Sequence, residues 1–510
     1  MKKPFLFFVL ISVLFFSCVS WNNQLETKVE SVIQKEMQKI INYVNGWCLR
    51  LKVNFNEFIV LAFNLAQKRD PSILEYYMLK GLNENKGYHL SYENLLAIAL
   101  IGDDYLLTYD DCLRFIQNVR PGNFSITKKI KQTVKELEAV DIEKIIEEKI
   151  TQALEQLPFL DEQPVIDLVY EKDKSYQTYF GYLHAHSDLS DGEGTPEQAY
   201  AYARDKGKLD FFALTDHAFY FHFWPWDNKW NRLKNAAKAA DDPGSFAALW
   251  GFEWTSPVFG HINVLNSEKY QSCISRFWIW DFYIWLSQQQ NVFARFNHPG
   301  DVNWLNVEFL HLYNFPLVTS VISGIETWVY KSGFEKYYYT DDWGKGSPYI
   351  DVGNLNNWYL GALGGQDNHA KTWGTLNDYR VGVLADGLTR ENIFEAYQHR
   401  RYYATEDKDL FVDFRCQGYP MGSRIYTDNR DFTVKVKDQS NDNVKEVVLL
   451  KNGKEIDKKQ VSGPDIEVNF SDAVSTGKDY YYVIVRMQDD GNDHNNEAIT
   501  TPIWILGPNL

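Results

Sequence analysis

Between residues 176 and 405, apolar runs alternate with helix signals, and this alternation constrains the fold more than any other feature of the chain. Helix signals precede the run 209–214: Thr195 as N-cap, Pro196 at the first helical position, and Gly207 as the stop. The apolar runs have the continuous hydrophobicity of strands covered on both faces, and they are 209–214, 246–252, 262–265, 292–296 and 360–363. Strands that alternate with helices predict an α/β fold with a parallel sheet, curled into a barrel.

The segments on either side of this region have different textures. From 19 to 160, apolar residues recur at three- and four-residue spacing, which predicts an all-helical N-terminal region. Pro158 and Pro164 mark a linker after it. From 407 to 510, short alternating runs are separated by turn signals such as Asn452-Gly453, which predicts a C-terminal β-sandwich.

The first 18 residues have the form of an export signal. Met1-Lys2-Lys3 is followed by an apolar run from 5 to 16, which is too short to span a bilayer comfortably, and then by Cys18. We expect an exported lipoprotein of a bacterial cell envelope, held to the membrane by a lipid on Cys18. Ordinary signal cleavage nearby is the alternative. Cys48 and Cys112 either form a disulfide or remain buried thiols.

The overall charge excludes one class of partner. The formal net charge is −16 over 510 residues, whereas binding to a nucleic-acid duplex requires a basic face that displaces counterions. We therefore expect no duplex binding. A pocket loaded with metal ions would still accept an anionic small molecule.

His184 and His186 close the apolar stretch 179–183. In a strand, residues at i and i+2 point to the same side, so the two imidazoles can bind one cation. Further imidazoles and carboxylates follow or border later apolar runs, where the strand ends of an α/β barrel bring loops together. They are His217, Glu253, His261, His298, Asp367 and His369.

Mixed imidazole and carboxylate ligands suit Zn²⁺, Mn²⁺ or Fe²⁺, while Ca²⁺ and Mg²⁺ prefer oxygen ligands. These candidates are too many for one tetrahedral ion. Two or three divalent ions, with Glu253 bridging two of them, account for the number better. Clustered metals give hydroxide from bound water near neutral pH and stabilise the oxygens of an ester, so the expected reaction is hydrolysis.

Several motifs together resemble the PHP (polymerase and histidinol phosphatase) superfamily. They are Leu183-His184-Ala185-His186-Ser187, Ser190-Asp191-Gly192, Leu214-Thr215-Asp216-His217, Asn297-His298-Pro299 and Asp367-x-His369. Added motifs resemble the CehA/McbA metallohydrolase branch: Gly251-Phe252-Glu253, Gly260-His261-Ile262-Asn263 and Tyr402-Tyr403-Ala404-Thr405. The resemblance covers about half of the chain. It implies a distorted seven-stranded (βα) barrel with a trinuclear site.

The resemblance also divides the ligands among three metals. His184, His186, Glu253 and Asp367 match the ligands of the first metal, and Glu253 is shared with a second metal. His261 and His298 match that second site. The third site is matched by Asp191, His217 and His369, where Asp191 stands at a position that is histidine in some relatives.

Four other residues have two interpretations each. Asp216 either orients His217 or acts as an acid or base, and Glu326 is either a substrate contact or a structural residue. Arg295 and Lys371 either neutralise a phosphate or pair with an acid. The aromatic segment 219–226 is either a substrate lid or part of the core.

These observations predict a metal-dependent hydrolase that acts on phosphate esters. The same hydroxide could attack a carbonyl, so hydrolysis of a carboxylic or carbamic ester is the first alternative. A surface binding protein that has lost turnover is the second alternative, although the ligand set looks complete.

Overall fold

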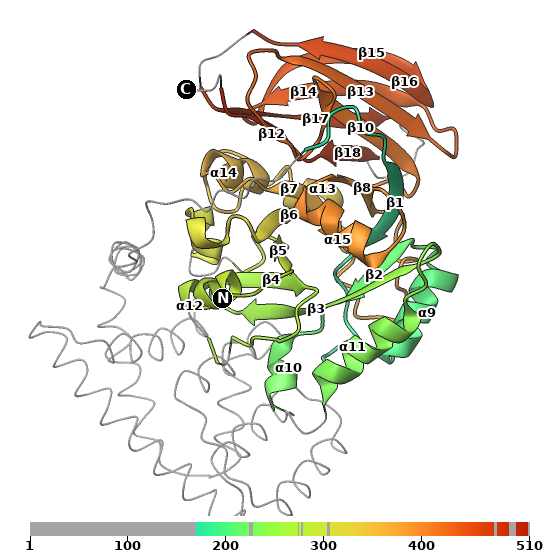
Figure 1. Cartoon of the computed structure of the whole chain (residues 1–510), viewed down its shortest axis with the longest axis vertical. Coiled ribbons are helices and arrows are strands. Elements are labelled where there is room, and N and C mark those ends of the chain that lie inside the picture. Colours follow the sequence, from blue (N-terminus) through green and yellow to red (C-terminus); the bar gives the residue numbers. More distant parts are fainter. Residues whose placement is uncertain are drawn as a thin grey trace, which may run out of the picture. The chain divides into compact units, whose positions relative to one another are not determined.

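The structure is a computed structural model that describes residues 170–507, except 224–227, 274, 277–278, 303–306, 474–476 and 489–495. The expected export signal, the helical region from 19 to 160, and Cys48 and Cys112 lie outside the described residues. The described residues belong to one compact unit, Leu157–Leu510. They form a mixed α/β fold built on a curled sheet (Figure 1).

The first part of the large sheet follows the strand order β9-β8-β1-β2-β3-β4-β5-β6-β7. Its strands are β1 (Gln177–Tyr182), β2 (Phe211–Leu214), β3 (Ala247–Ser256), β4 (Gly260–Leu265), β5 (Phe293–Asn297), β6 (Ile322–Val329), β7 (Gly361–Gly365), β8 (Arg380–Ala385) and β9 (Tyr402–Thr405). Every residue of β2 to β7 is buried. The expectation of strands covered on both faces is therefore confirmed.

The sheet departs from a uniform parallel (βα) repeat at β4, and also at its other end, where β8 is antiparallel to both β1 and β9. Strands β1, β2 and β3 pair in parallel, and so do β5, β6 and β7, but β4 is antiparallel to both β3 and β5. Only residues 257–259 separate β3 from β4. A parallel crossover needs a dozen or more residues, so this short connection can only make a hairpin.

Helices connect most of the remaining strands. They are α9 (Pro196–Asp205), α10 (Ala218–Phe223), α11 (Lys229–Ala240), α12 (Ile279–Ser287), α13 (Gly333–Tyr337), α14 (Tyr349–Leu355) and α15 (Arg390–Gln398), with 3-10 turns η2 (Glu308–Leu312) and η3 (Pro316–Val318). The predicted start of α9 is confirmed: Thr195 accepts a hydrogen bond from the backbone of Gln198, and the Gln198 side chain accepts one in return. This capping box satisfies two backbone donors at the helix start.

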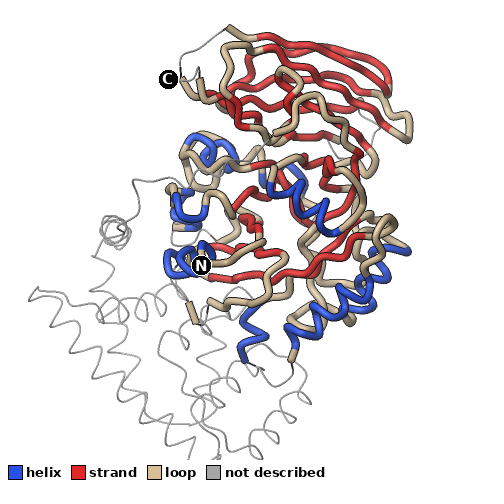
Figure 2. The backbone as a smooth tube through the Cα atoms, in the orientation of Figure 1, coloured by secondary structure: helices blue, strands red, loops and turns tan. Residues whose placement is uncertain are grey.

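The C-terminal strands form two layers, as Figure 2 shows. One is a four-stranded sheet of β10 (Leu410–Cys416), β11 (Tyr419–Pro420), β13 (Asp431–Asp438) and β16 (Asp465–Ser471). The other continues the large sheet and holds β12 (Arg424–Ile425), β14 (Val444–Lys451), β15 (Lys454–Gly463), β17 (Asp479–Met487), β18 (Glu497–Thr500) and β19 (Ile503–Ile505).

A shared hydrophobic core holds these two layers together. Phe414 and Phe432 from the four-stranded sheet lie in one buried cluster with Tyr481 and Val483 from β17. Strand β18 also pairs with β9, so the second layer continues directly into the curled sheet. The sandwich therefore packs on the barrel through hydrogen-bonded strands as well as through side chains.

The segments that follow β1 and β7 meet at one edge of the curled sheet. Ala185 and Asn368 form an isolated parallel bridge, and the backbone N–H of Asp367 donates to the carbonyl of His184 at 3.1 Å. A second bridge joins His217 to Glu253. Residues that follow different strands are thereby fixed beside one another at this edge.

Two smaller findings concern the described residues. Cys416 is a buried free thiol, and Cys273 is buried as well. No described helix has the length and apolar character that a membrane span requires.

Candidate metal centre

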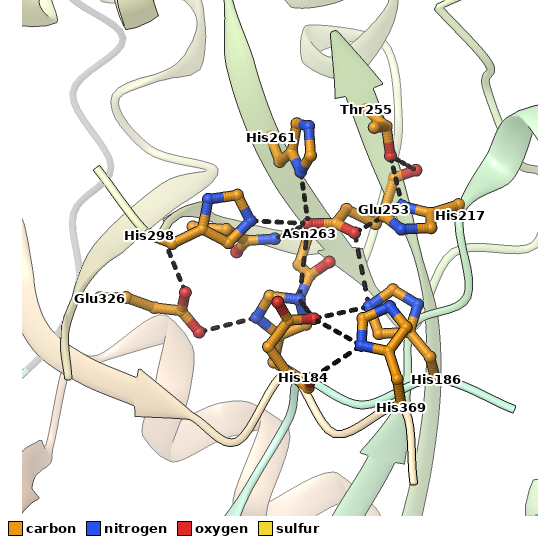
Figure 3. Close-up of polar contacts among 12 residues, drawn as sticks. His184, His186, His217, Glu253, Thr255, His261, Asn263, His298, Glu326 and His369 are labelled. Atoms are coloured by element: carbon orange, nitrogen blue, oxygen red, sulfur yellow. Dashed lines mark hydrogen bonds and ion pairs between the residues drawn. The ribbon is translucent and has the colours of Figure 1, made fainter. Parts of the chain in front are cut away.

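Glu253 lies at the middle of a group of imidazoles (Figure 3). This residue of β3 is fully buried. Its Oε1 lies 3.4 Å from Nε2 of His184, 3.4 Å from Nδ1 of His261 and 3.5 Å from Nε2 of His298. Its Oε2 lies 3.5 Å from Nε2 of His186. One carboxylate thus faces histidines from several strands.

Asp367 supplies a second carboxylate to the same group. Its Oδ1 lies 3.2 Å from Nε2 of His184 and 2.9 Å from Nε2 of His186. Asp367 and His298 both have left-handed backbone, with φ of 44° and 28°. Such conformations cost free energy for residues other than glycine, and they occur preferentially at functional sites.

A third group surrounds Asp191. Its Oδ1 lies 3.4 Å from Nε2 of His369, and its Oδ2 lies 3.7 Å from Nε2 of His217. The ring of His186 stacks on that of His369 with centroids 4.1 Å apart. The clusters that could hold a metal ion therefore share members. Each of four residues belongs to two clusters: His184, His186, Glu253 and His298. All nine residues expected as ligands lie in these overlapping clusters.

The strand directions explain why these residues converge. His184, His186 and Asp367 follow the carboxyl ends of β1 and β7, while His298 follows β5. His261 instead lies near the start of β4. Because β4 runs antiparallel to its neighbours, its amino end lies at the edge where the parallel strands end.

The residues present fit divalent metal ions. Nε2 of His184, Nε2 of His186, Oε2 of Glu253 and Oδ1 of Asp367 are buried and make no well-aligned hydrogen bond to a described residue; their contacts with one another and with His217, at 2.7–3.5 Å, are ion pairs. Such atoms carry a large desolvation cost. In a tetrahedral site with metal–ligand bonds of about 2.0–2.1 Å, neighbouring ligand atoms are ~3.3 Å apart. The observed separations of 3.2 Å from His184 to Asp367 and 3.4 Å from His184 to Glu253 match that value.

The pKa values of these side chains follow from this crowding. Burial by itself would raise the pKa of Glu253, but His217, His261 and His184 hold it well below its usual value. Burial would lower the pKa of His184, yet the carboxylates of Glu326, Asp367 and Glu253 raise it well above its usual value. Protons on imidazoles therefore balance the carboxylates, and bound cations would replace those protons.

Glu326 binds the outer side of the first group. Its Oε1 lies 2.8 Å from Nδ1 of His184, and its Oε2 accepts a hydrogen bond from the backbone N–H of His298 at 2.8 Å. Arg295 donates to Oε1 at 2.6 Å. Of the two interpretations of Arg295, this contact favours pairing with an acid. Lys371 is exposed.

Asp216 contacts the loop that carries Asp191. Its carboxylate accepts hydrogen bonds from the backbone N–H and the hydroxyl of Ser187, both at 2.8 Å, and from the hydroxyl of Ser190 at 2.6 Å. Ser190 Oγ in turn lies 3.4 Å from Nδ1 of His186. Asp216 is fully buried, and its hydrogen bonds to Ser187 and Ser190 hold this loop in place.

Two residues of the site were not expected from the sequence. Thr255 Oγ1 lies 2.7 Å from Nδ1 of His217, and Asn297 donates from Nδ2 to Oε1 of Glu253 at 2.7 Å. Thr255 lies two residues after Glu253 in β3, so strand alternation would have placed both on one face. Asn297 had a weaker signal, since it only precedes His298.

The centre is open on one side. The side chains of His369 and Asp367 are 36% and 25% exposed, whereas those of His184, His186 and Glu253 are fully buried. In the aromatic segment, Phe219 and Phe221 are buried, and the Phe219 ring stacks on that of His217 at 5.6 Å. These contacts favour core packing for that part of the segment. Residues 224–226 lie outside the described residues.

No protein-family model matches the chain, and no curated protein matches it. Among solved structures, the chain is similar to a two-domain protein from Bacteroides vulgatus that contains a predicted PHP-like metal-dependent phosphoesterase. The identity is 15% and the TM-score 0.35, over 65% of this chain and 98% of that chain. A likeness this weak leaves the site's own residues to carry the functional proposal.

Proposed function

We propose that this chain is a metal-dependent hydrolase of the PHP superfamily that acts on phosphate esters. The convergence of six histidines and three acids on one edge of the curled sheet supports this proposal most. These residues are His184, His186, Asp191, His217, Glu253, His261, His298, Asp367 and His369. Bound cations would explain why several buried ligand atoms of these residues make no well-aligned hydrogen bond. The motifs around them further support the CehA/McbA branch.

The contacts are consistent with two or three ions of Zn²⁺, Mn²⁺ or Fe²⁺. Glu253 is shared between the group of His184 and His186 and the group of His261 and His298. Asp191 lies in a further group. When bound, clustered divalent ions supply a nucleophile from water near neutral pH and neutralise charge on the ester.

Asp216 and Glu326 act in this proposal as positioning residues. Glu326 accepts a hydrogen bond from the Nδ1–H of His184, which leaves Nε2 of that ring to face Glu253 and Asp367. Asp216 fixes the loop that ends at Asp191 through Ser187 and Ser190. Neither side chain is exposed, so direct contact with substrate is not part of their role.

Substrate would reach the centre from the side of Asp367 and His369, because these ligands retain exposed surface. An anionic phosphate ester suits a centre whose cations exceed its carboxylates in charge. The same centre accepts a carboxylic or carbamic ester, so the assay must separate the two classes.

The test is hydrolysis of p-nitrophenyl phosphate, bis-p-nitrophenyl phosphate and aryl acetates by the full-length protein, together with elemental analysis. We expect phosphate-ester hydrolysis that requires bound metal. The double variant H184A/H186A should lose metal and activity together. His399→Ala is the matched control, since His399 pairs with Glu395 outside the centre.

Each other outcome has a definite meaning. Activity confined to the acetates would replace the phosphoesterase proposal with the carboxylic or carbamic ester alternative. Full metal content with no hydrolysis of any ester would favour the surface binding protein. Wild-type metal content in the double variant would reject the metal centre itself.

We also propose export and a lipid anchor at Cys18, supported by the charged start and apolar run before it. In a bacterial host, the wild-type protein should fractionate with membranes, and Cys18→Ala should release it. Equal distribution of the two proteins would reject the anchor.

A further inference from the structure

Three aspartates lie together where the curled sheet meets the sandwich. Asp407 follows β9 by two residues, Asp438 is the last residue of β13, and Asp442 lies in the loop that leads to β14. Each offers a carboxylate oxygen, and these oxygens lie within 4.8 Å of one another. Asp409 lies beside them and accepts a hydrogen bond from Ser440 at 2.8 Å.

One of these side chains is buried with a carboxylate oxygen that has no hydrogen-bond donor. Asp438 is only 2% exposed, and its Oδ2 makes no hydrogen bond to a described residue. Its Oδ1 accepts from the backbone N–H of Asp442 at 2.7 Å. A buried carboxylate oxygen without a donor is costly, and it needs a partner such as a cation or water.

Basic side chains do not supply that partner. Among the described residues, no Lys, Arg or His nitrogen forms a salt bridge with Asp407, Asp409, Asp438 or Asp442; the neighbouring Lys408 instead lies 3.8 Å from Asp378. The arrangement therefore concentrates negative charge that a bound cation would relieve.

We propose that Asp407, Asp438 and Asp442 form a calcium site that fastens the end of the curled sheet to the sandwich. The ligand set is oxygen-only, which suits a hard cation and differs from the imidazole-rich metal centre. Three carboxylates from a strand end and two loops suit the flexible coordination of Ca²⁺. Mg²⁺ demands stricter geometry and retains more of its water.

A calcium ion at this site would join the curled sheet to the four-stranded sheet of the sandwich. Asp407 continues from β9, which pairs with β8 and β18, while β13 belongs to the separate four-stranded sheet. An ion held between Asp407 and Asp438 would link these layers near the pairing of Leu410 with Asp438. Ca²⁺ binds the folded state only, so it should stabilise the fold.

The experiment is calcium titration calorimetry on the full chain carrying its transition metals, with thermal unfolding followed in parallel. We expect one Ca²⁺ per chain with a Kd on the order of 10⁻⁵ to 10⁻³ M. Millimolar Ca²⁺ should raise the midpoint of thermal unfolding. Asp442→Asn should weaken binding at least about tenfold, and the exposed position of Asp442 protects the variant from misfolding.

Two further variants make the result specific. Asp465→Asn is the matched control, because Asp465 is an exposed aspartate of β16 that lies near Lys437. It should bind Ca²⁺ like wild type. H184A/H186A should also keep its Ca²⁺ while losing transition metal, which separates this site from the metal centre.

The proposal would be overturned if the wild-type protein released or absorbed no heat on titration with Ca²⁺ and if Ca²⁺ did not change its midpoint of thermal unfolding. Equal calcium affinity in wild type and Asp442→Asn would overturn it as well. Neither result would bear on the hydrolase, whose test is transition-metal content and ester turnover.

Discussion

Buried carboxylates in two regions of this protein have opposite electrostatic states. In the metal centre, burial would raise the pKa of Glu253, but His217, His261 and His184 hold it well below its usual value. Where α14 meets β17, burial raises the pKa of Asp351 to about 6, although the hydroxyls of Tyr480 and Tyr482 oppose this by donating to it at 2.9 Å each.

The comparison shows that burial prevails where the partners of an acid are uncharged, and that charged partners overcome it. Protonated imidazoles keep a neighbouring carboxylate ionised. Metal ions that bind Asp367 and Glu253 would therefore take the place of the protons on the imidazoles. Tyrosine hydroxyls offer hydrogen bonds without charge, so Asp351 is a neutral packing element over part of the pH range. Figure 3 shows the first environment, with dashed contacts between imidazoles and acids.

The largest expected effect comes from Glu253→Gln. The amide keeps the shape of the side chain but removes the negative charge that faces His184, His261 and His298. Metal affinity and ester hydrolysis should both fall by more than about 100-fold, since losing a ligand exceeds the effect of losing its orienting partner. Elemental analysis and turnover measure this.

The matched control is Asp351→Asn, which makes the same chemical change in the other region. It should leave metal content and turnover at the wild-type level. Equal metal loss in both variants would mean that the two regions do not differ as described.

A smaller effect is expected from Glu326→Gln. The change weakens the contact that orients His184 and the pairing with Arg295, but it removes no atom that faces the metals. Metal affinity or activity should fall about 10- to 100-fold. Competition with a chelator measures the affinity. Glu406→Gln is the control, because that buried carboxylate accepts from the backbone of Phe334 instead.

The pH dependence of the free energy of unfolding tests the second region, where Asp351 has tyrosine partners. The pKa of Asp351 is raised in the folded state, from 3.8 to about 6. Its contribution to stability is therefore complete below about pH 4 and is lost as the pH rises through about 6. Relative to wild type, Asp351→Asn should gain on the order of 3 kcal/mol in free energy of unfolding across that window.

Urea unfolding of both proteins at several pH values measures this difference. Tyr482→Phe removes the hydroxyl that donates a hydrogen bond to Asp351. This variant should lower the free energy of unfolding most above pH 6, where the carboxylate is ionised. A difference between wild type and Asp351→Asn that does not change with pH would contradict the assignment.

The smallest effect is expected at Thr195, which lies outside the clusters that could hold a metal ion. Thr195→Ala removes the capping box of α9 and should cost about 1 kcal/mol of stability. Metal content should stay at the wild-type level, as measured on the same preparation. Loss of metal would show that the start of α9 controls the loop with Asp191.

Much of the site could be predicted from local patterns. His184 and His186 share a side because strands alternate, and Thr195-Pro196 marks a helix start because its backbone donors need a cap. The partners of Asp216 and Glu326 were beyond such patterns. Ser187 is 29 residues from Asp216, and His184 is 142 residues from Glu326, so only folding brings each pair together.

The sequence by itself determined which chemistry the chain can support, because residue types fix the ligand atoms and short spacings fix the faces of strands. The tertiary structure decided which of these atoms meet. It reversed β4 through a hairpin of three residues and so brought His261 to the edge where β1, β5 and β7 end. It also gave buried acids different neighbours, and in a low-dielectric interior the neighbours set the charge.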